Sequence, residues 1–226
     1  MSTAVVLLSG GLDSTVTLAT ARERFNRVLT LGFNYGQRHK RELESAVNIA
    51  QFYDVSFSII DLRSVLPLIQ SSSLTNSEIE VPLGHYASET MKATVVPNRN
   101  AMFLSVAYGY AVSERAEAVF TGIHAGDHFI YPDCRPEFIE SLSHSFQLGN
   151  LGFGNPSLQI IAPFVHLTKT DIAREGQRLG VPFQMTWSCY QGQALHCGEC
   201  GTCVERIEAF DEAGVPDPTE YMNGRL

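Results

Sequence analysis

The chain has 226 residues, a formal net charge of −8 and a hydrophobic fraction of 44%. This length allows one well-packed core, or one core with a small appendage. The acidic balance disfavours a nucleic-acid partner, because binding to a phosphate backbone normally depends on clustered Lys and Arg. No apolar run approaches the length of a membrane span, and no basic segment precedes the first short apolar run. We therefore expect a cytoplasmic protein with no membrane partner.

Short apolar runs alternate with segments of helical periodicity along the chain. The strand-like runs cover residues 4–8, 28–33, 56–60, 118–121 and 159–162. Helical stripes are formed by Leu43, Ala46, Val47 and Ala50, by Phe103, Val106, Ala107 and Tyr110, and by Ile139, Leu142 and Phe146. The alternation predicts an α/β fold with an open, mainly parallel, Rossmann-like sheet, helices on both faces and a ligand crevice at the carboxyl ends of the strands.

The first strand runs directly into a glycine-rich turn that opens a helix. Adjacent glycines let backbone N–H groups turn towards an anion, and the helix adds the positive end of its dipole, so this turn predicts a phosphate site. A carboxylate beside phosphate is repelled unless it holds a metal or orients the loop, so we assign Asp13 to Mg²⁺ binding or to loop geometry. The predicted nucleotide-binding residues are Ser9, Gly10, Gly11, Leu12, Asp13, Ser14 and Thr15.

Four of the five cysteines lie near the end of the chain, at Cys189, Cys197, Cys200 and Cys203. In a reducing compartment, two overlapping Cys-x2-Cys turns indicate a tetrahedral metal site, and four sulfurs with no open position indicate structural zinc. An iron–sulfur cluster and a redox Cys-x2-Cys pair are the alternatives. His196 could replace one sulfur.

The predicted organisation is an α/β nucleotide-binding domain over residues 1–185, followed by a zinc module with a terminal helix over residues 186–226 that packs as part of the same domain. The segment 67–97 has little periodicity and is interpreted as a long loop, a type of segment that often forms a lid. A second irregular segment, 148–156, could border the site or an interface.

The motif S-G-G-x-D-S at the first turn resembles the PP-loop of ATP pyrophosphatases, which cleave ATP between its α and β phosphates. Three further motifs stand in a recognisable order: residues 35–39 (YGQRH), 96–100 (VPNRN) and 131–135 (YPDCR). Together with the cysteine spacing, they make the chain resemble the 7-cyano-7-deazaguanine synthases of queuosine biosynthesis from residue 5 to about residue 206.

This resemblance implies an ATP-dependent ligase forming C–N bonds. Such an enzyme converts 7-carboxy-7-deazaguanine and ammonia to 7-cyano-7-deazaguanine through an adenylated carboxylate and an amide. It further implies ATP with Mg²⁺, structural zinc, small-molecule substrates and a homodimer. The predicted catalytic residues are Asp13, Ser14, Arg99 and Lys169. Arg99 and Lys169 are chosen as phosphate contacts because each lies near a predicted helix start at the ligand edge. An ordinary surface cation is the alternative for both, more so for Lys169 than for Arg99, which stands between two Asn residues.

The heterocycle needs groups that complement a carboxylate and a guanine-like edge. Asp127 or Asp133 could accept hydrogen bonds from that edge, and Arg135 could bind the carboxylate through a bidentate pair of hydrogen bonds. Tyr131 or Phe129 could stack on the ring. A helix cap is an equally good interpretation of Asp133.

Three other functions remain open at this point. A PP-loop enzyme that modifies tRNA shares residues 9–15, and a zinc-knuckle binding module shares the cysteine cluster. A relative that adenylates the deazaguanine and transfers it to another amine is the third, because the run 124–130 departs from the pattern of the family.

Overall fold

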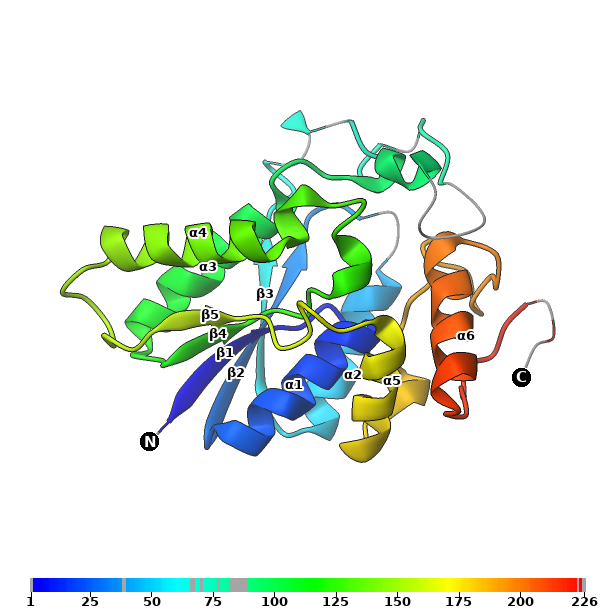
Figure 1. Ribbon diagram of the computed structural model, residues 1–226. Helices are drawn as coiled ribbons and strands as arrows, with labels where there is room; N and C mark the ends of the chain where they lie inside the picture. Colours follow the sequence, from blue (N-terminus) through cyan, green and yellow to red (C-terminus); the bar gives the residue numbers. More distant parts are fainter. Residues whose placement is uncertain are drawn as a thin grey trace.

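The computed structural model describes residues 2–37, 40–65, 68–69, 71–76, 78–81, 89–222 and 224. Arg38, His39 and part of the loop expected at 67–97 lie outside these residues. Figure 1 shows the arrangement of the elements. The strands are β1 (Thr3–Leu7), β2 (Arg27–Asn34), β3 (Ser56–Asp61), β4 (Ala118–Phe120) and β5 (Gln159–Ile161). The helices are α1 (Leu12–Arg24), α2 (Arg41–Phe52), α3 (Arg99–Ser113), α4 (Pro136–Gly149), α5 (Lys169–Arg178) and α6 (Gly201–Ala213).

The five strands form one parallel sheet in the order β3-β2-β1-β4-β5. Val5 of β1 lies opposite Leu29 of β2 on one side and Val119 of β4 on the other. The chain winds outward from β1 in both directions, so the order reverses beside β1 at its border with β4. Ligands bind at such a reversal in open α/β sheets, at the carboxyl ends of the strands. The fold class predicted from the sequence is confirmed.

Alternate residues of β1 enter two hydrophobic cores, one on each face of the sheet. Val6 packs on the face covered by α1, α2, α5 and α6, whereas Val5 packs on the face covered by α3 and α4. Both side chains are fully buried. Figure 1 shows the same division, with α3 and α4 on one side of the sheet and α1 and α5 on the other.

Three short 3-10 helices lie at the carboxyl edge of the sheet or beside it, at Glu89–Thr94, Ala125–Asp127 and Pro132–Cys134. The first falls within the segment expected to be a loop. In the part of the chain that the structure describes, no helix has both the length and the apolar character needed to cross a membrane.

The C-terminal residues pack against the α/β core through Arg206 of α6, which is completely buried. Its guanidinium donates to Asp217 Oδ1 at 3.0 Å, to Thr186 Oγ1 at 2.7 Å and to the carbonyl of Phe183 at 3.3 Å. Of these contacts, the one with Phe183 crosses the boundary predicted at 185/186. The boundary itself stays a prediction.

Candidate active site and metal centre

The turn after β1 is held against α2, and this contact explains its first glycine. Gly10 has φ +89°, a conformation that residues with a Cβ rarely adopt. A Cβ at Gly10 would lie 2.3 Å from the carbonyl oxygen of Glu42. The hydroxyl of Ser45 donates to the Gly10 carbonyl at 2.8 Å. The backbone of α2 therefore supports the turn where only glycine fits.

Hydroxyl groups brace the start of α1. Ser14 Oγ and Thr15 Oγ1 donate to the Gly11 carbonyl at 3.1 and 2.7 Å, and Ser14 Oγ accepts from the N–H of Ser9 at 3.2 Å. Among the described residues, no side chain caps α1. Because Leu12, Asp13 and Ser14 line the pocket, the positive end of the helix dipole lies at its wall, as an anion site requires.

One pocket lies at the carboxyl edge of the sheet and is lined by residues from several elements that meet there. It includes the turn after β1, the start of α3, the segment after β4, the start of α5 and part of the cysteine-rich segment. The chain order separates these elements widely, and the parallel sheet brings their ends to one edge. Its lining includes Ser9, Gly11, Leu12, Asp13, Ser14, Arg99, Asp127, Tyr131 and Lys169, all of which the sequence predicted as site residues.

Lys169, the first residue of α5, lies among carboxylates. Its Nζ is 2.5 Å from Glu205 Oε2 and 3.4 Å from Asp13 Oδ2. The Lys169 side chain is only 11% exposed, so it is not an ordinary surface cation. Burial opposes its charge, but the attraction of Asp13 and Glu205 outweighs burial and raises the pKa of Lys169. Its ammonium therefore stays charged beside the phosphate-binding turn.

A second charged group faces the pocket from α3. The Arg99 guanidinium lies 5.8 Å from the centre of the Tyr131 ring. Burial and the negative charge of Glu42 raise the pKa of Tyr35 to about 12, while Arg99 opposes the rise. Burial raises the pKa of Glu42 to about 7, again opposed by Arg99. Glu42 and Tyr35 line the pocket and were not predicted as site residues, although Tyr35 begins the motif at 35–39 and Glu42 follows that motif closely.

Of the residues predicted to bind the heterocycle, Asp127 and Tyr131 lie in the pocket wall. Tyr131 is buried, and its hydroxyl is hydrogen-bonded to the hydroxyl of Thr94 at 2.6 Å. Asp127 Oδ2 lies 3.6 Å from Nε2 of His124. His124 Nδ1 accepts a hydrogen bond from the N–H of Gly126 at 3.1 Å.

The other candidates lie outside this lining. Arg135 is exposed, and its Nε donates to the carbonyl of His128 at 3.0 Å. Phe129 is 55% exposed. Asp133 Oδ2 accepts from the N–H of Asn100 at 3.1 Å, so it caps the start of α3 rather than the helix that follows it. None of these three side chains lines the pocket, so Asp127 and Tyr131 remain the candidates for contact with the heterocycle.

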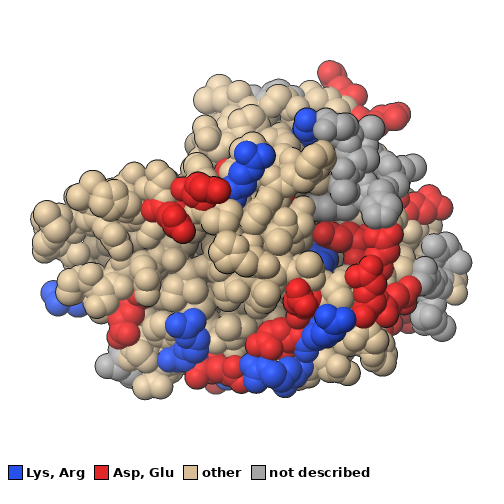
Figure 2. All heavy atoms as spheres, viewed as in Figure 1, with Lys and Arg blue, Asp and Glu red and all other residues tan. Residues whose placement is uncertain are grey.

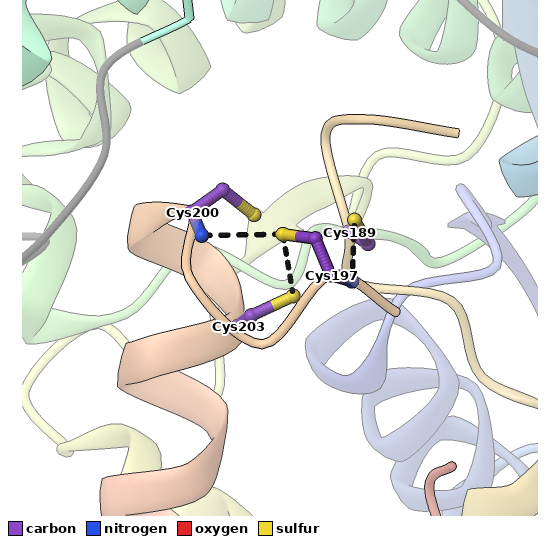
Figure 3. Close-up of side chains that lie close together, drawn as sticks. All are labelled: Cys189, Cys197, Cys200 and Cys203. Atoms are coloured by element: carbon purple, nitrogen blue, oxygen red, sulfur yellow. Dashed lines mark hydrogen bonds between the residues drawn. The ribbon is translucent and has the colours of Figure 1, made fainter. Parts of the chain in front are cut away.

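The four C-terminal cysteines converge on one point (Figure 3). Their sulfurs all lie within 4.8 Å of one another, and Cys197 Sγ is 3.9 Å from Cys203 Sγ. Four sulfurs around one tetrahedral Zn²⁺, each at about 2.3 Å, would lie about 3.8 Å apart. The cluster has both the donor set and the dimensions of a closed metal site.

Backbone amides point at these sulfurs. The N–H of Cys200 donates to Cys197 Sγ at 3.2 Å, and the N–H of Cys197 donates to Cys189 Sγ at 3.4 Å (Figure 3). Such donors favour thiolates, the form that binds metal. His196 does not join the set, because its Nε2 accepts from the N–H of Ser188 at 3.1 Å.

Fold and site together define an α/β enzyme of the PP-loop type. In agreement, the structure of NMN synthetase from Francisella tularensis is similar in fold, with a TM-score of 0.51 and 16% identity over 95% of this chain and 73% of that one. The likeness at this identity concerns the fold alone.

The family follows from sequence comparison. The model of the family "Queuosine biosynthesis protein QueC" matches residues 3–214. The chain is 52% identical over 220 residues to a 7-cyano-7-deazaguanine synthase of Rhizobium meliloti, covering 96% of this chain and 91% of the relative. It is 47% identical to 7-cyano-7-deazaguanine synthase 1 of Mesorhizobium japonicum, covering 96% and 93%. The chain belongs to the QueC family, and the family and enzyme class predicted from the motifs are confirmed.

Proposed function

We propose that this chain converts 7-carboxy-7-deazaguanine and ammonia to 7-cyano-7-deazaguanine at the expense of two ATP. The observation that carries the proposal is full-length similarity to relatives named for this product, in a chain whose PP-loop turn lies beside Lys169. The turn after β1, the end of β2 and the segment after β4 line one pocket, which we assign to both ATP and the heterocycle.

In the first half-reaction, a carboxylate oxygen attacks the α-phosphorus of ATP and pyrophosphate leaves, which gives an acyl adenylate. The chain supplies no covalent nucleophile for this step. It supplies positioning and electrostatic stabilisation. The N-terminus of α1 and the Lys169 ammonium offset the charge that develops on the departing pyrophosphate, and Arg99 offers a further cation in the same pocket.

Asp13 fits a Mg²⁺ ion that accompanies ATP. Its Oδ1 is buried and, among the described residues, has no hydrogen-bond partner, whereas Oδ2 faces Lys169. A buried carboxylate oxygen left unpaired is costly, and Mg²⁺ prefers such oxygens. Bound there, the ion would neutralise phosphate charge.

In the second half-reaction, ammonia attacks the acyl carbon and AMP leaves, so an amide forms. The amide oxygen then attacks the α-phosphorus of a second ATP, and pyrophosphate leaves again. Loss of AMP with the remaining N–H protons leaves the nitrile. The pocket must therefore hold one heterocycle through two adenylations, for which Tyr131 offers an aromatic wall and Asp127 an acceptor for the guanine-like edge.

Zinc is the ion we propose for the four cysteines, with a structural role. Four sulfurs fill a tetrahedral coordination shell, so no position is left for substrate. Thiolate ligands persist in a reducing compartment, in keeping with a cytoplasmic enzyme.

We also propose a homodimer, with the end of α4 as the contact. Leu148, Leu151 and Phe153 are 61%, 80% and 74% exposed. Figure 1 shows this end of α4 and the following loop projecting past the sheet, where a second copy could cover them. Light scattering of the wild type and of Leu151→Ser tests this proposal, and a wild-type monomer would refute it.

Nucleotide analysis tests the proposed chemistry. Turnover on the carboxylate should release AMP and pyrophosphate, and Asp13→Ala should abolish turnover with the fold intact. Formation of ADP and phosphate would refute attack at the α-phosphorus.

The two alternative functions predict other outcomes. Acidic side chains gather around α6 in Figure 2, and the net charge is −8, so we expect no dependence of turnover on added tRNA. A deazaguanine amide joined to another amine, in place of the nitrile, would indicate the transfer function instead.

A further inference from the structure

Of the two carboxylates described beside Lys169, the nearer one comes from α6, the helix that contains Cys203 and has Cys200 at its N-cap. Glu205 Oε2 accepts from Lys169 Nζ at 2.5 Å, and the Glu205 side chain is 14% exposed. Lys169 lies farther from Asp13, at 3.4 Å. Glu205 thus holds the ammonium by a short contact, in a place largely shielded from water.

The other oxygen of Glu205 lies against Gly126 in the segment after β4. A Cβ at Gly126 would lie 3.2 Å from Glu205 Oε1 and 2.9 Å from the Cε1 atom of His124. A side chain at position 126 would therefore crowd both the carboxylate and the histidine ring. Gly126 leaves the space that the Glu205 carboxylate needs to reach Lys169.

The cysteine cluster fixes where α6 begins. Cys200 is the N-cap of α6, Cys203 lies in its first turn, and Glu205 follows two residues later. Figure 1 shows α5 and α6 side by side, so the start of α6 faces the start of α5, where Lys169 lies. A closed metal site at the first turn therefore sets the position of the Glu205 carboxylate.

From these contacts, and resting on the proposed function, we propose that Glu205 is a positioning residue for adenylation: acting through Lys169, it holds the ammonium where the departing pyrophosphate develops charge. Glu205 bears the same charge sign as ATP, so it gives no attraction to the nucleotide. Its contribution lies in the geometry of Lys169. An ammonium on a flexible four-carbon stem stabilises a transition state well only when it is held in place.

The test compares Glu205→Gln with a matched control, Glu212→Gln. Glu212 also lies on α6 and accepts from α5, through the hydroxyl of Thr170 at 2.8 Å, but it is exposed and does not contact Lys169. In Glu205→Gln we expect the rate of pyrophosphate formation to fall about 10- to 100-fold. The Kd for α,β-methylene-ATP should not rise, because the substitution removes a negative charge near the bound nucleotide. Glu205→Asp, which keeps the charge on a shorter stem, should retain an intermediate rate, and Glu212→Gln should retain the full rate.

A double-mutant comparison shows whether Glu205 acts through Lys169. In a Lys169→Ala background, Glu205→Gln should cause no further loss of rate. An undiminished loss in that background would overturn the proposal. So would a full rate in Glu205→Gln, weaker analogue binding, or loss of zinc from Glu205→Gln by elemental analysis.

A readout without turnover separates this proposal from the proposed function. In the ligand-free protein, the held Lys169 ammonium should give a slowly exchanging 15N signal, assigned by its absence from Lys169→Arg. The signal should be lost in Glu205→Gln and kept in Glu212→Gln. If it is missing from the wild type or persists in Glu205→Gln, the positioning role is refuted. A wild type that shows the signal but forms no AMP would refute the proposed function alone.

Discussion

Asp133 Oδ2 accepts a hydrogen bond from the backbone N–H of Asn100 at 3.1 Å, across 33 residues of chain. Asn100 is the second residue of α3, and Arg99 is the first. A carboxylate at this place satisfies an N–H that the helix leaves free and complements the helix dipole. Asp133 therefore fixes the end of α3 from which Arg99 reaches the pocket.

Asp133→Ala should lower the free energy of unfolding by about 1 kcal/mol, the usual cost of a lost helix cap. Asp133→Asn retains an acceptor oxygen and should recover most of this loss. Urea denaturation measures both. A different result would contradict the capping role: if Asp133→Asn were as unstable as Asp133→Ala and neither variant bound the heterocycle, a direct contact with the substrate would be the better account of Asp133.

Much of the fold and of the site could be predicted because the signals are local. The apolar run of β1 followed by two glycines predicts a strand, a turn and an anion site within a few residues, and the Cys-x2-Cys spacing predicts a metal site in the same way. Lys169 was found by its place near a predicted helix start, where the structure shows a capping box between Thr168 and Asp171.

Glu42 and Glu205 could not be found in this way. Each lies on a helix in a sequence with many surface carboxylates, and neither belongs to a spacing pattern. Their proximity to Arg99 and to Lys169 arises only when α2 and α6 pack at the edge of the sheet. The capping of α3 by Asp133 was not predicted for the same reason. A sequence suggests a cap for the helix that directly follows the residue, and α3 begins more than 30 residues before Asp133.

Cys200→Ser should remove the bound metal and lower the Tm, since a hydroxyl does not replace a thiolate ligand and a structural zinc site contributes its binding energy to folding. Cys134→Ser is the control, because Cys134 is buried outside the four-sulfur cluster. Elemental analysis should find one zinc per chain in the wild type and in Cys134→Ser. A wild type without zinc, or a Cys200→Ser protein of full thermal stability, would contradict the assignment.

Gly10→Ala should inactivate the enzyme and destabilise it by more than the backbone cost alone. Its Cβ would lie 2.3 Å from the Glu42 carbonyl, so the turn or α2 must move. Gly214→Ala is the matched control, because Gly214 also has a positive φ, +68°, but its Cβ would meet nothing within 4 Å. We expect Gly214→Ala to cost about 1–2 kcal/mol and to leave the activity intact. Equal effects of the two substitutions would argue against a tight PP-loop contact with α2.

Glu42 should make stability depend on pH. Burial raises its pKa from 4.5 to about 7, so between these values the folded chain binds more protons than the unfolded chain. Its contribution to stability therefore falls as the pH rises through this window. Glu42→Gln removes the titration, so the Tm of the variant relative to the wild type should rise from pH 4.5 to pH 7. Parallel Tm curves would show that Glu42 is not held in its protonated form.

The most direct test of the account is the product formed from 7-carboxy-7-deazaguanine, ATP, Mg²⁺ and 15N-ammonium. Mass spectrometry should find 7-cyano-7-deazaguanine carrying one 15N, and nucleotide analysis should find two AMP and two pyrophosphate for each nitrile. An amide observed early and consumed later would support the order of the two adenylations. ADP and phosphate as the only nucleotide products, or a heterocycle that never gains nitrogen, would contradict the account.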